Sequence, residues 1–209
     1  MSDARLNEAQ LQQLKSALHS GADDASTAMA RWLGVPSLLV VDSLEQVPVE
    51  SAVTLLGADM TTVCLCAMQM SGGLRGQLVF AFDDCSGLTL TDLLLKKDAG
   101  STTDWDDVAQ SAALETTNII GCAYLNALSS DLSGRMPTMQ ELIPSPPVFR
   151  RDFAESLLQS VIMDQAVASD TVLMTRVRFE LNHQPMQWTL LMVPDPESLD
   201  QLRSLLPHE

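Results

Sequence analysis

Hydrophobic and polar positions along the first half of the chain follow two periods, one typical of helices and one typical of strands. Apolar residues recur at helical spacing up to Gly34-Val35-Pro36, a combination that ends helices. Apolar runs separated by a Ser-Gly-Gly turn then predict a β-hairpin. The predicted elements are a helix over 7–33, a strand over 37–47, a short helix over 47–57, strands over 61–70 and 74–82, and a helix from Asp83 or Asp84 to about 97.

The second half repeats this order of elements. The predicted elements are a helix over about 106–132, a short extended piece within 138–151, a helix over 152–168, strands over 170–181 and 186–193 joined by a turn at 182–185, and a helix over 194–206 that Asp195 caps. We therefore predict one α+β domain spanning 1–209. It consists of two pseudo-twofold repeats, about 6–97 and 104–206, and its antiparallel sheet is covered by helices.

Charge and cysteine content narrow the function classes. The formal net charge is −15, so the surface repels nucleic-acid phosphates and anionic membranes, and we expect neither as a partner. The polar N-terminal sequence shows no secretory signal, and no apolar run is long enough to span a bilayer, so a cytoplasmic location is expected. Cys64 and Cys66 point to the same face of a strand and are expected to be buried free thiols rather than metal ligands.

The helix over 111–128 carries an unusual pair of polar residues. At 100° per residue, one face is formed by Ala113, Thr117, Ile120, Tyr124 and Ala127, and the opposite face by Ser111, Glu115, Asn118 and Cys122. Glu115 and Asn118 lie one turn apart and point outward together. They are either solvated surface residues or parts of a binding or catalytic site.

The pattern Ser111-x3-Glu115-x2-Asn118, followed by the PSPP segment at 144–147, resembles the CheC/CheX/FliY family of chemotaxis phosphatases. The apolar run after Asn118 and the internal duplication are similar to that family as well. The resemblance implies a CheC-like fold and an enzyme that hydrolyses the aspartyl phosphate of a CheY-like receiver domain. It implies Glu115 and Asn118 as the catalytic residues, and Ser111 and Pro147 as supporting or partner-binding residues. The gap between Asn118 and Pro147 is longer than in the family, and residues 131–142 resemble an insertion.

The resemblance also implies which chemical groups the receiver and this chain each contribute to the reaction. The receiver brings its own Mg²⁺, lysine and hydroxyl group, so this chain is expected to need no cofactor or metal. What remains to be supplied is a water placed in line with the breaking bond. The Asn118 carboxamide suits this task because it donates and accepts hydrogen bonds and adds no negative charge. Glu115 would pair with the receiver's lysine.

Two further readings remain open. The chain is either an active phosphatase or a non-catalytic module of the same fold that docks a receiver or serves as an adaptor in a flagellar switch. The intact pair favours the enzyme, and the altered proline spacing favours the module. In the first half, the positions equivalent to Glu115 and Asn118 are Ser16 and His19, so a single site per chain is expected.

Overall fold

The structure is a computed structural model, and it describes residues 5–48, 51, 62–136, 138–163, 171–181 and 184–206. Most of the short helix predicted over 47–57 lies outside the described residues, as does the start of the turn at 182–185. The other predicted elements can be compared with the structure directly.

Five described helices begin close to where the sequence places them, and the predicted end of the helix over 152–168 lies outside the described residues. The helices are α1 (Glu8–Leu33), α3 (Asp84–Leu94), α4 (Asp107–Arg135), α5 (Ala154–Met163) and α6 (Pro196–Leu205). The side chains of Asn7, Asp83, Asp106 and Asp195 accept hydrogen bonds from the first-turn amides of α1, α3, α4 and α6. Of the two aspartates proposed to begin α3, Asp83 is therefore the cap. Gly34 ends α1 in the left-handed conformation.

The described strands form one antiparallel sheet. They are β1 (Ser37–Pro48), β2 (Thr62–Gly72), β3 (Gly76–Phe82), β4 (Leu142–Pro144), β5 (Val148–Phe153), β6 (Thr171–Leu181) and β7 (Gln184–Pro194). Their order is β1-β6-β7-β3-β2-β4, and β5 also pairs with β2. The α+β class is thus confirmed. The single extended piece predicted within 138–151 is in fact two strands, because the prolines of the PSPP segment interrupt the pairing with β2.

Corresponding strands of the two halves occupy corresponding positions when the sheet is counted from its two edges. The sheet contains the series β1-β6-β7-β3-β2-β5, in which the first strand of each half pairs with a strand of the other half. The two central strands, β7 and β3, join the halves. This arrangement is what two related halves would produce, although the repeat boundaries 6–97 and 104–206 stay a prediction.

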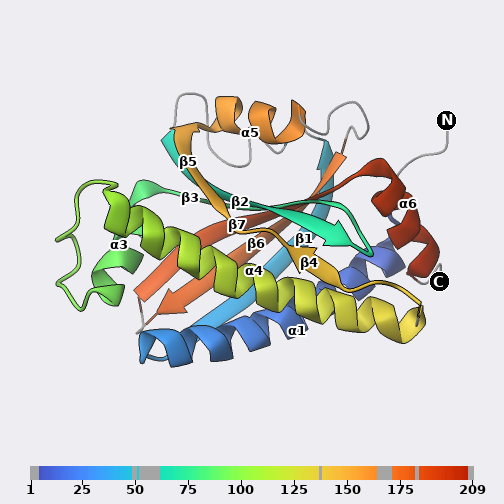
Figure 1. The fold of residues 1–209 in the computed structure, drawn as a ribbon, viewed down its shortest axis with the longest axis horizontal. Helices are drawn as coiled ribbons and strands as arrows, with labels where there is room; N and C mark the ends of the chain where they lie inside the picture. The colour runs from blue at the N-terminus through green and yellow to red at the C-terminus, as the bar shows by residue number, and fades with distance from the viewer. Residues whose placement is uncertain are drawn as a thin grey trace.

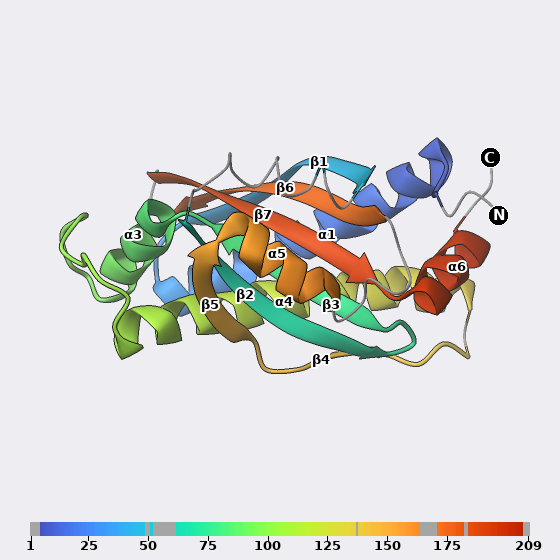
Figure 2. The same ribbon diagram turned by 90° about the horizontal axis from the view of Figure 1, so that it is seen from above.

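Helices cover both faces of the sheet (Figure 1). Helices α1 and α4 lie side by side on one face, and α5 lies on the other, as the view from above also shows (Figure 2). The core is correspondingly divided into a large layer under α1 and α4 and a smaller layer under α5. Cys64 and Cys66 are buried free thiols in the larger layer, as expected, and burial raises the pKa of Cys66 to about 12.

Helices α1 and α4 approach closely at Gly21. A Cβ atom added there would lie 2.7 Å from the ring and 2.9 Å from the Cα atom of Tyr124, so only glycine allows this crossing. Gly121 likewise brings α4 close to the sheet, since an added Cβ would lie 2.4 Å from the sulfur of Met68. Both contacts hold the segment of α4 that carries Asn118 against the rest of the domain.

Candidate functional site

The four residues singled out in the sequence line one hollow. Ser111, Glu115 and Asn118 come from the outer face of α4, and Pro147 comes from the segment between β4 and β5. The hollow has a volume of about 520 Å³. The described residues that line it are Ser111, Leu114, Glu115, Asn118, Cys122, Pro144, Ser145, Pro146 and Pro147. The helix face and the PSPP segment are therefore two walls of the same site.

The PSPP segment, residues 144–147, forms one wall of the hollow, which we call the proline wall. This wall is fixed to strand β2. The Ser145 amide donates to the Gln69 carbonyl oxygen at 2.9 Å, and the Gln69 amide donates to the Ser145 hydroxyl oxygen at 2.9 Å. Pro144 continues the β4 pairing opposite Met70. Because prolines have no amide hydrogen, Ser145 supplies the hydrogen-bonding groups that its neighbours lack. The wall is thereby held at a set position beside α4.

The long gap between Asn118 and Pro147 does not move the proline away from the helix. Helix α4 continues from Asn118 to Arg135, a rise of about 26 Å, and strand β4 then begins at Leu142. The PSPP segment that follows lines the same hollow as Asn118. The longer spacing therefore leaves Pro147 beside the helix.

The polar side chains of the hollow differ in exposure and in hydrogen bonding. Glu115 is exposed and Asn118 is half-buried. The Cys122 thiol donates to the Asn118 Oδ1 atom at 3.8 Å, a weak contact that restrains the carboxamide. The Ser111 hydroxyl donates to the Asp107 carbonyl oxygen at 2.7 Å, so its proton is used within the helix. Ser111 can still accept a hydrogen bond from a partner.

Cys122 belongs to the site, although its role was not predicted from the sequence. Burial raises the pKa of its thiol, and the negative charge of Glu115 raises it further. The thiol therefore keeps its proton at neutral pH and can donate it to Asn118. The available signal was its spacing, since Cys122 lies one helical turn beyond Asn118 on the same face.

A second set of contacts fastens β5, the strand that follows the proline wall. The Arg151 guanidinium donates two hydrogen bonds to the Asp84 carboxylate, at 2.8 and 2.7 Å. The Trp105 indole donates to the same carboxylate at 2.8 Å, and the Cys64 thiol contacts it at 3.4 Å. Arg151, followed by the indole and the thiol, lowers the pKa of Asp84 to about 2 despite partial burial. This cluster ties α3, β5 and the segment before α4 together.

The depressed pKa of Asp84 predicts a loss of stability in acid. Its contribution is fully present above the ordinary value of 3.8 and is lost as the pH falls through about 2. Allowing for solvent screening of this partly exposed carboxylate, Asp84→Asn should cost about 1 kcal/mol at neutral pH and less near pH 2. Urea unfolding at a series of pH values measures this. Asp98→Asn, which alters an exposed aspartate of the next loop, is the matched control. Equal acid sensitivity in the wild type and Asp84→Asn would contradict the assignment.

The described residues offer neither a metal cluster nor a membrane span. Within them, no group of three or more His, Cys, Asp or Glu side chains is placed to hold a metal ion. No helix among them is long and apolar enough to cross a bilayer. The hollow itself contributes one carboxylate, that of Glu115.

Solved structures with the same architecture identify the fold. FliY from Thermotoga maritima superposes with a TM-score of 0.73 at 13% sequence identity, over 96% of each chain. The chain has the fold of the CheC/CheX/FliY family. This confirms the resemblance at the level of fold. No family model matches the sequence.

Two further neighbours show the range of this CheX/FliY fold. The FliM middle domain from H. pylori has a TM-score of 0.66 at 13% identity, covering 96% of this chain and all of that domain. CheX from Borrelia burgdorferi, solved as a CheX-CheY-BeF3-Mg²⁺ complex, has a TM-score of 0.51 at 15% identity and covers 84% and 96% of the two chains. At these identities the comparisons establish the fold, and the chemistry must be argued from the hollow.

Proposed function

We propose that this chain is a phosphatase that hydrolyses the aspartyl phosphate of a CheY-like receiver domain. The observation that carries the proposal is the hollow in which Glu115 and Asn118 lie one turn apart, opposite the proline wall. The fold supports it, because CheX, another protein of this fold, was solved in complex with CheY, BeF3 and Mg²⁺. The pair is accessible at the surface, as a site acting on another protein must be.

Asn118 orients the attacking water in this mechanism. The contact from the Cys122 thiol to Oδ1 restrains the carboxamide, and the described contacts leave its two Nδ2 hydrogens and a lone pair of Oδ1 available. A water held by these groups can be aligned with the phosphorus–oxygen bond that breaks. The neutral amide adds no repulsion to a transition state rich in negative charge.

Glu115 docks the receiver. It is exposed, and none of the described ion pairs engages its carboxylate, so it is available to a cation of the partner. A lysine beside the receiver's phosphorylation site would form a charge-assisted contact with it. The Mg²⁺ needed to neutralise the phosphoryl group would come with the receiver, since the hollow supplies a single carboxylate.

A non-catalytic adaptor is the second candidate. FliM middle domains share the fold at TM-scores above 0.6, and one of them was solved in complex with FliG. A module of this kind would use the same exposed helix face for docking and would leave the phosphoryl group intact. Phosphate release separates the two functions.

The deciding experiment is phosphate release from a panel of phosphorylated receivers. The purified chain should accelerate hydrolysis of at least one receiver well above that receiver's own rate, and the acceleration should be catalytic rather than stoichiometric. Binding to a receiver without any acceleration would establish the adaptor function instead.

The proposed function predicts one site per chain. Each buried position of α1 corresponds to a buried position of α4 when 99 is added to its number. In this alignment Ser16 is equivalent to Glu115, and His19 is equivalent to Asn118. Both are exposed, and His19 Nδ1 lies 2.8 Å from the Lys15 carbonyl oxygen. Ser16→Ala and His19→Ala should keep dephosphorylation within about twofold of wild type. Calorimetry with a BeF3-loaded receiver should give a stoichiometry of one. Two bound receivers, or a large loss of activity in His19→Ala, would contradict the prediction.

A further inference from the structure

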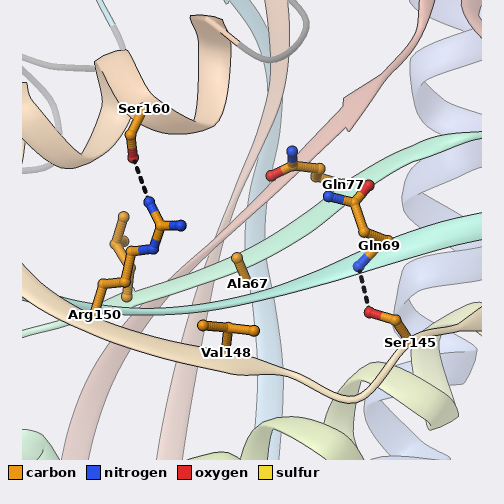
Figure 3. A pocket seen from close by; sticks show the side chains of 8 residues that line it. Ala67, Gln69, Gln77, Ser145, Val148, Arg150 and Ser160 are labelled. Carbon is orange, nitrogen blue, oxygen red and sulfur yellow. Dashed lines mark hydrogen bonds between the residues drawn. The ribbon is translucent and has the colours of Figure 1, made fainter.

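A second hollow lies on the opposite face of the sheet, beneath α5 (Figure 3). It has a volume of about 110 Å³. Its lining comes from β2, β3, β5, α5 and the proline segment, and consists of Leu65, Ala67, Gln69, Gln77, Ser145, Val148, Arg150 and Ser160. The phosphatase proposal makes no use of this hollow.

Two carboxamides meet on one side of it. Gln69 and Gln77 are paired across β2 and β3, and their side chains lie next to each other in Figure 3. Gln77 is only 4% exposed, yet none of the hydrogen bonds among the described residues uses its carboxamide. Its side chain lines the hollow, where the carboxamide can donate and accept hydrogen bonds. Gln77 therefore offers hydrogen-bonding groups to a polar ligand.

A single cation stands on the other side. The Arg150 guanidinium donates to the Ser160 hydroxyl at 3.3 Å, and none of the described residues that line the hollow carries a carboxylate. Other arginines, such as Arg75, Arg151 and Arg178, have an acidic partner close by, as expected for a chain of net charge −15. A cation kept apart from carboxylates and facing two amides and two hydroxyls favours an anion.

The apolar residues at the floor of the hollow favour a carboxylate over a phosphate as the bound anion. Leu65 is buried in the smaller core layer, and Ala67 and Val148 stand beside it. A phosphate dianion would face these apolar groups and meet one positive charge. A short carboxylate places one charge at Arg150 and its hydrocarbon part over the floor. We propose that this hollow binds a small aliphatic carboxylate, which lies between Arg150 on one side and Gln77 on the other.

Ser145 connects this hollow to the first one. Its hydroxyl accepts from the Gln69 amide, and it lines both hollows. A ligand seated beside Gln69 would therefore contact the residue that fixes the proline wall. The binding proposal itself is independent of phosphatase activity, since it rests on the residues of the second hollow.

The test is titration of the full chain with propionate, followed by amide resonances in solution. We expect saturable shifts that include Gln69 and Ser145, with a Kd of about 1 mM, a realistic strength for about five non-hydrogen atoms. Arg150→Gln should weaken binding at least tenfold, since it removes the charge at an exposed position without disturbing the core. Gln77→Leu should weaken it as well.

Three controls make the outcome decisive. Arg31→Gln removes an exposed arginine from the other side of the sheet and should leave propionate binding unchanged. Propionamide has the shape of propionate without its charge and should not bind. Inorganic phosphate should bind more weakly than propionate. Absence of saturation at about 50 mM propionate, equal binding by Arg150→Gln, or tighter binding of propionamide or phosphate would each overturn the proposal.

Discussion

Replacing Asn118 by alanine is expected to slow receiver dephosphorylation about 100-fold or more, the scale associated with a misplaced reactant. The side chain lies in the hollow and contacts Cys122 only weakly, so the fold should be unaffected. Binding of the receiver should also persist, because Glu115 and the proline wall remain. The expected signature is therefore a fall in the turnover rate at nearly constant affinity.

Two variants sharpen this test. Asn126→Ala removes the same group from an exposed position further along α4 and should keep the full rate. Asn118→Asp retains the size of the side chain but adds a negative charge near the phosphoryl group, so it should be at least as slow as Asn118→Ala. Full activity in Asn118→Ala, measured by phosphate release beside an active wild type, would remove Asn118 from the mechanism.

Reversing the charge of Glu115 is expected to have the second largest effect, this time on docking. Glu115→Ala should weaken binding of a BeF3-loaded receiver about tenfold, and Glu115→Lys should weaken it further because two cations would meet. Binding titrations at two salt concentrations measure this, and the loss should shrink as salt screens the pair.

Charge reversal elsewhere provides the control for Glu115. Glu45→Lys makes the same change on β1, in the half of the chain that lacks the pair, and should leave receiver binding intact. If both reversals weakened binding equally, the cause would be the overall charge of the chain rather than docking at the hollow. If neither did, Glu115 would be an ordinary solvated residue.

Local sequence patterns predicted most of this fold. Helix α4 shows why: Ala113, Thr117, Ile120, Tyr124 and Ala127 are all buried, as their helical spacing required. Capping residues and the Gly-Pro stop placed the ends of α1 and α6 for equally local reasons. The spacing of Glu115 and Asn118 likewise fixed their common face before any tertiary contact was known.

Contacts between distant segments could not be predicted in this way. The residues next to Asp84 and Arg151 in the sequence do not indicate that the two side chains pair. They meet because β5 aligns antiparallel to β2. The second hollow draws its residues from several elements, so no spacing in the sequence could indicate it. The division of 138–151 into β4 and β5 also depended on the neighbouring strand rather than on the segment itself.

The two halves depend on each other because β1 of the first half pairs with β6 of the second, and β5 of the second half pairs with β2 of the first. A fragment containing only residues 104–206 would keep the β6–β7 pair but would lack β1 beside β6, β3 beside β7 and β2 beside β5. Its sheet would have open edges and its strand β5 no neighbour at all. The first half carries Ser16 and His19 where the second carries Glu115 and Asn118, yet its strands remain necessary to complete the sheet on which α4 packs.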